Sequence, residues 1–201
     1  MRIVVPSSGT YYHIESLEAP RYAQYFDVVT SPEKLATELK PEDCLFVPCR
    51  TPHPRMVAQK ALIQQHLDAG GTVVAMGESN SELWLPNVQF HSCATNWWWW
   101  LTPGADLGVS PRNTEHPLLK NMSKEHVTWH LHGHFDVPDG ATVLAVDNLE
   151  QPIFYLDEVS TNGRMLVTSL DPMYHHGSHF MPATTRFLDQ FLPNLKEWLN
   201  G

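Results

Sequence analysis

The first half of the chain alternates short apolar, β-rich runs with segments of helical periodicity. The runs at residues 44–48 and 72–76 are continuously apolar, as in strands that are buried on both faces. Between them, residues 54–69 carry apolar side chains at helical spacing, and Gly70 and Gly71 supply a left-handed helix end. Shorter β-rich runs precede them at residues 3–5 and 26–29. Such alternation requires parallel strand pairing with right-handed crossovers.

The second half has a different pattern. Residues 141–146, 152–159 and 164–169 are strand-like and are joined by short polar turns, which predicts an antiparallel meander. A final helix carries an apolar face, and we expect Pro193 to break or restart it. Residues 83–113 are expected to be irregular. We therefore predict one α/β domain over residues 1–201, a flavodoxin-like three-layer sandwich with a mainly parallel central sheet and an antiparallel C-terminal portion.

Composition limits the class of protein. The 201 residues carry a net charge of −9, which disfavours general binding to nucleic acids and to anionic membranes. No apolar run is long enough to span a membrane, and the start is too short in its apolar part for a secretory signal. Three cysteines without metal-type spacing argue against a disulfide framework. We expect a soluble, cytoplasmic protein, with a homo-oligomer left open.

Two segments carry a family resemblance. Residues 43–81 contain a buried strand, a long helix, the paired glycines, a second buried strand and a tight turn at residues 77–79. The meander then closes on Ser-Leu-Asp-Pro at residues 169–172. In these features the chain resembles the ThuA-like branch of the class I glutamine amidotransferase-like superfamily, over about two-thirds of its length. Relatives of this branch are associated with carbohydrate utilisation.

The resemblance does not extend to a catalytic Cys-His-Glu triad. Active members need a cysteine at the strand-to-helix turn and a histidine and a glutamate after a later strand. Here Gly77 falls at the nucleophile position, Asp171 at that of the histidine and Met173 at that of the glutamate. Cys49 could substitute if Arg50 and His53 lowered its pKa, although a buried structural cysteine is the simpler interpretation. We expect no glutamine hydrolysis.

The candidate site lies in the loops that follow the strands, because the carboxyl ends of parallel strands converge. Glu78 would either cap a following helix or bind a ligand. We take Glu78, Asp171 and His175 as candidate catalytic residues. The candidate ligand-binding residues are Ser7, Ser8, Arg50, Glu78, Ser79, Asn80, His132 and His176.

Histidines and tryptophans are clustered. His130, His132 and His134 would share one face of an extended strand and could bind Zn²⁺, but Gly133 could break that strand. We therefore expect neither a metal nor another cofactor, and a hydrogen-bonded histidine face instead. His175, His176 and His179 are expected in one loop. Four consecutive tryptophans at residues 97–100 would stack on sugar rings or lie in the core and a subunit interface.

Two functions of different classes follow. The first is a non-amidotransferase binding or accessory protein for a small polar ligand, with a sugar-derived molecule as one candidate. The alternative is a hydrolase of different chemistry that uses Glu78, Asp171 and the clustered histidines, with or without a metal. The sequence leaves open whether the protein is an enzyme.

Overall fold

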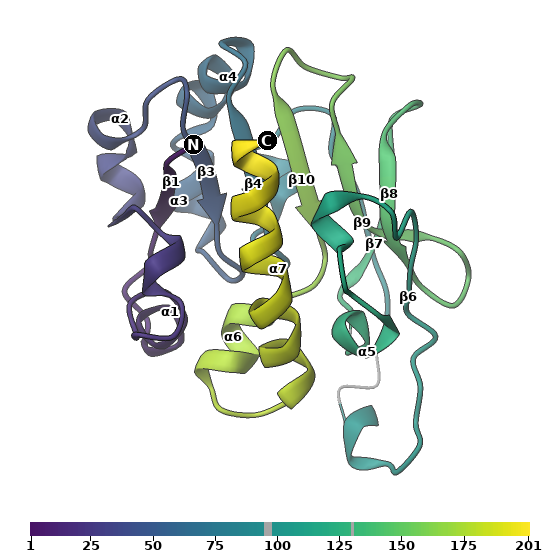
Figure 1. The fold of residues 1–201 in the computed structure, drawn as a ribbon. Helices are drawn as coiled ribbons and strands as arrows, with labels where there is room; N and C mark the ends of the chain where they lie inside the picture. The colour runs from purple at the N-terminus through teal and green to yellow at the C-terminus, as the bar shows by residue number, and fades with distance from the viewer. Residues whose placement is uncertain (95–97, 130) are drawn as a thin grey trace.

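One large mixed sheet forms the centre of the chain (Figure 1). The structure is a computed structural model that describes residues 1–94, 98–129 and 131–201. The strands of this sheet are β1 (Ile3–Pro6), β2 (Val28–Thr30), β3 (Cys44–Val47), β4 (Thr72–Ala75), β6 (Ser110–Pro111), β8 (Thr142–Val146), β9 (Pro152–Asp157) and β10 (Arg164–Thr168). Their order is β2-β1-β3-β4-β10-β9-β8-β6.

The sheet is parallel in one part and antiparallel in the other. The neighbouring strands β2, β1, β3, β4 and β10 pair in parallel. The neighbouring strands β10, β9, β8 and β6 pair antiparallel. Strand β10 therefore joins the two parts, parallel to β4 and antiparallel to β9. The predicted α/β class, with a mainly parallel sheet and an antiparallel C-terminal portion, is confirmed.

Helices pack against both faces of the parallel part. The helices of the described chain are α1 (Tyr11–Leu17), α2 (Leu35–Glu38), α3 (His53–Val57), α4 (Lys60–Asp68), α5 (Lys124–Val127), α6 (Pro172–Gly177) and α7 (Pro182–Asn200), with 3₁₀ turns at Ala23–Tyr25, Pro32–Lys34, Ser81–Leu83, Trp99–Leu101 and Pro117–Leu119. Successive strand side chains point to opposite faces. Val5 accordingly lies in one apolar cluster with Phe187 of α7, and Val4 lies in another with Ile63 of α4.

Two helical expectations need correction. The helix predicted over residues 54–69 is divided, because α3 ends at Val57 and α4 begins at Lys60. The predicted break at Pro193 is wrong, since α7 runs continuously from Pro182 to Asn200. Phe191 and Leu195 are fully buried on either side of Pro193. The free energy gained by burying these side chains offsets the cost of the backbone hydrogen bond that proline cannot donate.

A small second sheet has one strand inside residues 83–113, which were expected to be irregular, and its other strand after them. Strand β5 (Gln89–Ser92) pairs antiparallel with β7 (Gly133–Asp136). A Cβ atom on Gly133 would lie 2.1 Å from the carbonyl oxygen of His91, so only glycine permits this close approach. Strand β7 therefore begins at Gly133 and leaves His132 just outside it. None of the described helices is long and apolar enough to cross a membrane.

Candidate functional site

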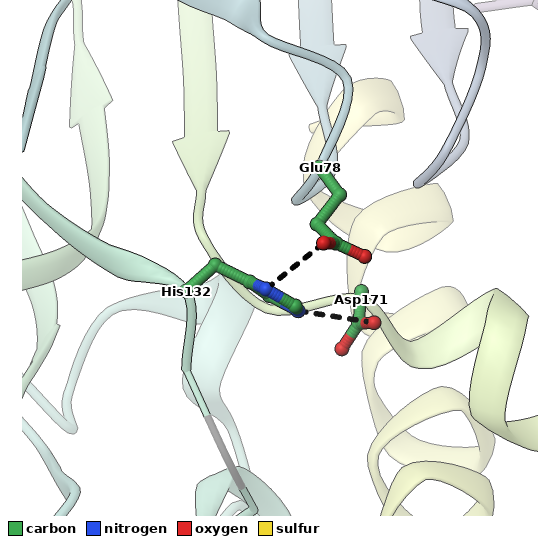
Figure 2. Close-up of side chains that lie close together, drawn as sticks. All are labelled: Glu78, His132 and Asp171. Carbon is green, nitrogen blue, oxygen red and sulfur yellow. Dashed lines mark ion pairs between the residues drawn. The ribbon is translucent and has the colours of Figure 1, made fainter. Parts of the chain in front are cut away.

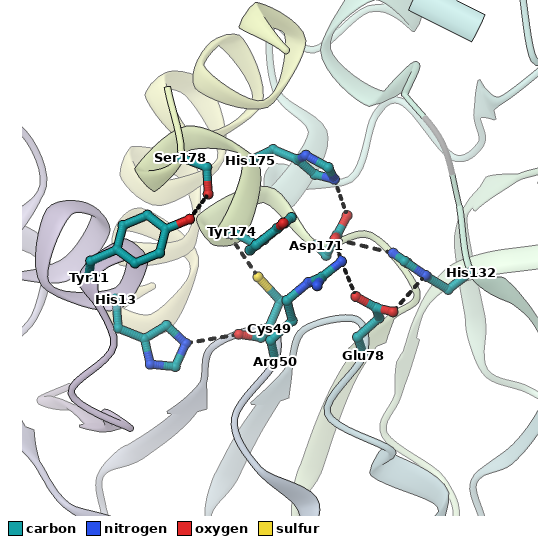
Figure 3. A network of polar contacts seen from close by, with 10 residues as sticks. All are labelled: Tyr11, His13, Cys49, Arg50, Glu78, His132, Asp171, Tyr174, His175 and Ser178. Atoms are coloured by element: carbon teal, nitrogen blue, oxygen red, sulfur yellow. Dashed lines mark hydrogen bonds and ion pairs between the residues drawn. The ribbon is translucent and has the colours of Figure 1, made fainter. Parts of the chain in front are cut away.

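Three charged side chains meet where the neighbouring strands β3, β4 and β10 end (Figure 3). Arg50 follows β3, Glu78 follows β4 and Asp171 follows β10. The Nη2 atom of Arg50 lies 2.5 Å from Oε2 of Glu78 and 3.5 Å from Oδ2 of Asp171. The structure thus brings together one predicted ligand-binding residue and two predicted catalytic candidates.

Two histidines complete this cluster. His132 bridges the carboxylates, with Nδ1 3.1 Å from Oε1 of Glu78 and Nε2 3.2 Å from Oδ2 of Asp171 (Figure 2). His175 approaches from α6, with Nε2 3.2 Å from Oδ1 of Asp171. We call Arg50, Glu78, His132, Asp171 and His175 the charged cluster.

Burial and pairing fix the charges within the cluster. Asp171 is fully buried, which would raise the pKa of its carboxyl, but His132 and His175 hold that pKa well below the usual range. Burial likewise tends to lower the pKa of His132, whereas its bonds to Asp171 and Glu78 raise that pKa to about 9. At neutral pH an ionised Asp171 therefore faces a protonated His132.

The turn after β4 presents Glu78 to the cluster in an unusual backbone conformation. Glu78 has a φ of +55°, a conformation that costs energy for a residue with a side chain. A Cβ atom on Gly77 would lie 2.3 Å from the carbonyl oxygen of Ser169, so close packing requires glycine there. Gly77 was expected at the nucleophile position, but Glu78 holds the strained position in this turn.

The interpretation of Glu78 as a helix cap is wrong. Only a single 3₁₀ turn, Ser81–Leu83, follows the bend after β4, and it gives no aligned helix dipole for the acid to stabilise. The side chain of Glu78 instead forms ion pairs with Arg50 and His132. Its predicted roles in ligand binding and in catalysis stay predictions.

Cys49 is structural. Its side chain is fully buried, and Sγ accepts a hydrogen bond from the backbone N–H of Tyr174 at 3.2 Å. Burial, with Asp171 nearby, raises the pKa of the thiol well above its usual value. This agrees with the simpler interpretation of Cys49 as a structural residue. Arg50 does not offset the effect of burial on the thiol: its guanidinium lies on the ring of Tyr174, 3.5 Å from the centroid, and pairs with Glu78.

A pocket of about 350 Å³ adjoins the cluster. Ser79 and Asn80, two of the candidate ligand-binding residues, line it beside Glu78 and His132. Ser79 is buried, and its hydroxyl donates to the carbonyl of Met76. The other lining residues were not predicted to bind a ligand: Met76, Gly77, Ser81, Glu82, Phe90, Ser92, Cys93, Phe135, Thr168 and Ser169. Those on β5 and β7 could not be assigned, because no pattern predicted the second sheet.

Several predicted residues lie elsewhere. Ser7 accepts a hydrogen bond from the N–H of Gly9, and Ser8 lies 2.8 Å from Nδ1 of His13; neither lines the pocket. His176 lies on the helix α6, not in a loop, so it points away from its neighbour His175 and contacts Thr185. Ser7, Ser8 and His176 are therefore not among the residues that line this pocket.

The predicted three-histidine face is only partly described, because His130 lies outside the described residues. His134 stacks on His91 with ring centroids 5.1 Å apart, whereas His132 joins the charged cluster. Within the described part of the chain, the atoms that could hold a metal belong to Glu78, His132 and Asp171 and lie within 4.8 Å of one another. Arg50 already contacts both of these carboxylates and supplies a positive charge there.

The tryptophan segment is likewise only partly described. Trp97 lies outside the described residues. Trp98 is 68% exposed, and Trp99 packs against the core. Trp98 and Trp99 are not among the described residues that line the pocket.

Comparisons with known proteins bear on the fold alone. No protein-family model matches the chain, and no curated protein matches it. A solved structure described as "Crystal structure of SMU.1228c" matches with a TM-score of 0.52 and 14% identity, over 100% of this chain and 100% of its own. This chain is therefore similar in fold to that protein over its whole length.

Proposed function

We propose that this chain is a ThuA-like member of the class I glutamine amidotransferase-like superfamily, with the flavodoxin-like three-layer arrangement of that group. We propose further that it binds a small polar molecule, a sugar-derived one being the leading candidate, and does not hydrolyse glutamine. The strand order, with a tight turn after the central strand β4, supports the first part.

The absence of a thiol at the turn supports the second part. Glu78 has a left-handed backbone conformation in this turn, and its carboxylate is a much weaker nucleophile towards an amide than a thiolate is. Asp171 and Met173 stand where the resemblance places the other triad members. Cys49 is buried, and its sulfur faces the backbone of Tyr174.

The observation that carries the binding function is that two members of the charged cluster, Glu78 and His132, line the pocket. Ion pairs hold Glu78 and His132 in place, so their polar atoms are preorganised and binding need not order them. Ser81, Ser92, Phe90 and Phe135 are among the other residues that line the pocket. A polar pocket with an aromatic wall suits a hydroxylated molecule that has one apolar face.

Thermal melting in the presence of a panel of monosaccharides, disaccharides and sugar alcohols tests this function. A ligand that binds the folded state raises the melting temperature, and Glu78→Gln should abolish that increase. Glu150 is a matched control, because it also has a positive φ and pairs with an arginine, Arg112, at 2.5 Å, outside the pocket. A panel without any stabilising compound would count against the proposal.

The second candidate is a hydrolase, and the strained φ of Glu78 favours it, because strain concentrates at catalytic turns. Both carboxylate oxygens of Glu78 are already engaged, by His132 and by Arg50, which favours binding over proton transfer. Release of p-nitrophenol from glycosides or of p-nitroaniline from amides, lost in Glu78→Gln but kept in Glu150→Gln, would establish the hydrolase instead.

A further inference from the structure

A second cavity, of about 430 Å³, lies between the segment after α1, the helix α6 and the start of α7. It shares no described lining residue with the pocket beside Glu78. The basic side chains that line it are Arg21, His176, His179 and Arg186. None of the described residues that line it is acidic, although the whole chain has a net charge of −9. Basic side chains from three segments thus converge on one cavity of an acidic protein.

Arg21 is held in place by an acid that is not among the described lining residues. Its Nε and Nη2 atoms donate to the two carboxylate oxygens of Asp189, at 3.0 and 2.7 Å. The hydroxyl of Tyr22 donates to the same carboxylate at 3.0 Å. A guanidinium has five N–H donors in a fixed fork, and those on Nη1 take no part in this pair. Arg21 is therefore oriented in advance and keeps donors for a further anion.

Arg186 adds a positive charge that no ion pair within the described chain neutralises. Its side chain is exposed, and Nη2 makes a long contact, 3.5 Å, with the backbone carbonyl of Glu125. A carbonyl oxygen accepts a hydrogen bond but carries no net charge. Of the two guanidinium charges at the cavity, one is therefore paired with Asp189 and the other remains for a ligand.

The start of α7 increases this positive potential. The helix is 19 residues long, its first turn contains no acidic residue, and its N-cap, Met181, provides no side-chain hydrogen bond. Pro182 and Thr185, at the start of the helix, line the cavity. The N-terminal end of a helix dipole is positive, so it favours an anion beside it.

We propose that this cavity binds the phosphate group of a small soluble molecule, at a second site separate from the pocket beside Glu78. Arg21 and Arg186 pair with the phosphate oxygens, because the planar guanidinium group matches their geometry. Phe180 and Pro182 form the apolar part of the lining and contact the organic part of a phosphate monoester. The surface of an anionic membrane is disfavoured as the source of the phosphate, since the net charge of −9 is repelled there.

Three compounds that share one ring test the charge of the ligand. Phenyl phosphate, benzoate and phenol are titrated into the full chain by calorimetry at about pH 7.5, where they are nearly dianionic, monoanionic and neutral. We expect phenyl phosphate to bind about fivefold more tightly than benzoate, because its second charge pairs with the second guanidinium. Phenol should not bind measurably.

Variants test the residues. Arg186→Gln should weaken the binding of phenyl phosphate about fivefold, because it removes the unpaired charge. Arg112→Gln is the matched control, since it removes the same charge from an arginine that pairs with Glu150 outside the cavity. His179 has a φ of +59°, which asparagine adopts readily, so His179→Asn removes the imidazole without new backbone strain and should weaken binding about twofold. Melting temperatures measured without ligand confirm that each variant is folded.

Binding to vesicles separates a soluble phosphate from a lipid. Phosphatidic acid presents the same phosphate monoester in a membrane, and we expect no co-sedimentation with phosphatidylcholine vesicles that contain it. Co-sedimentation that is lost in Arg186→Gln would overturn the assignment to a soluble molecule. The site itself would be refuted by equal binding of phenyl phosphate and phenol, by wild-type affinity in Arg186→Gln, or by an equal loss in Arg112→Gln. None of these results bears on the sugar-binding function, because the two sites share no described lining residue.

Discussion

At the scale of single residues, His132 is the residue on which the charged cluster depends. Its ring nitrogens lie 3.1 Å from Glu78 and 3.2 Å from Asp171, on two different loops. These contacts raise the pKa of His132 to about 9, although burial opposes the shift. The proton on this imidazole therefore links the turn after β4 to the loop after β10.

The first prediction is a loss of stability in alkali. Because the pKa of His132 is higher in the folded state than its usual 6.5, the folded state binds this proton more tightly. The stabilisation of the folded state by this proton should be complete below about pH 6.5 and should be lost as the pH rises through about 9. The free energy of unfolding should fall by roughly 3 kcal/mol over this range. Denaturant unfolding across this range measures it.

Comparison with variants isolates the effect from that of other groups that titrate in alkali. The difference in unfolding free energy between wild type and His132→Asn should shrink as the pH rises. His134→Asn, which removes a histidine outside the cluster, is the control. A pH-independent difference for His132→Asn would contradict the account.

The second prediction concerns the thiols. Cys44 and Cys49 are fully buried, and burial raises the pKa of each thiol, whereas Cys93 is half-buried at the pocket. Iodoacetamide should therefore modify Cys93 in the native protein and all three cysteines after unfolding. Mass spectrometry of the labelled peptides gives the answer, and rapid native labelling of Cys49 would refute its structural role.

At the scale of elements, the tight turn between β4 and the 3₁₀ turn Ser81–Leu83 positions the site. Gly77 lets this turn pack against the end of β10, and the N–H of Gly77 donates to the carbonyl of Leu170 at 2.8 Å. The two loops that carry Glu78 and Asp171 are thus fastened to each other by backbone contacts.

The third prediction follows from this packing. Gly77→Ala places a Cβ atom 2.3 Å from the carbonyl oxygen of Ser169, so one loop must move. We expect a destabilisation of about 1–3 kcal/mol and loss of ligand binding. Gly9→Ala is the control, because Gly9 has a left-handed φ but open space around an added Cβ atom. This substitution should destabilise the fold by about 1–2 kcal/mol, through backbone strain and not through a clash, and should leave ligand binding intact. Unimpaired binding by Gly77→Ala would contradict this role.

The fourth prediction concerns α7. Pro193 lies inside this helix, cannot donate a backbone hydrogen bond and is tolerated because residues on both sides are buried. Pro193→Ala should therefore stabilise the protein, by about 1–3 kcal/mol, because alanine restores the donor and the helix is already continuous. Chemical denaturation measures the change, and a loss of stability would show that the proline ring packs favourably in the core.

At the scale of the whole molecule, the sequence predicted the sheet well where the pattern was strong. The apolar runs at residues 44–48 and 72–76 became the central strands β3 and β4, because strands buried on both faces leave a clear signal. The pairing of β5 with β7 was not predicted, since its side chains are mostly half-buried or exposed and its register depends on Gly133.

The site was predicted only in part. Arg50, Glu78 and Asp171 follow strands whose carboxyl ends must converge, so their proximity could be inferred from topology. Ser169 and Glu82 carry no sequence signal that distinguishes them from other polar loop residues. His175 and His176 were predicted as one group, and the helical rotation between successive residues separates them.

The central claim is that the pocket beside Glu78 is the binding site. Its most direct test is the calorimetric affinity of the most tightly bound sugar for wild type, Glu78→Gln and Glu150→Gln. We predict that Glu78→Gln weakens binding about tenfold or more, as expected for a hydrogen bond to a charged group, while Glu150→Gln matches the wild type. Wild-type affinity in Glu78→Gln, or an equal loss in Glu150→Gln, would contradict the account.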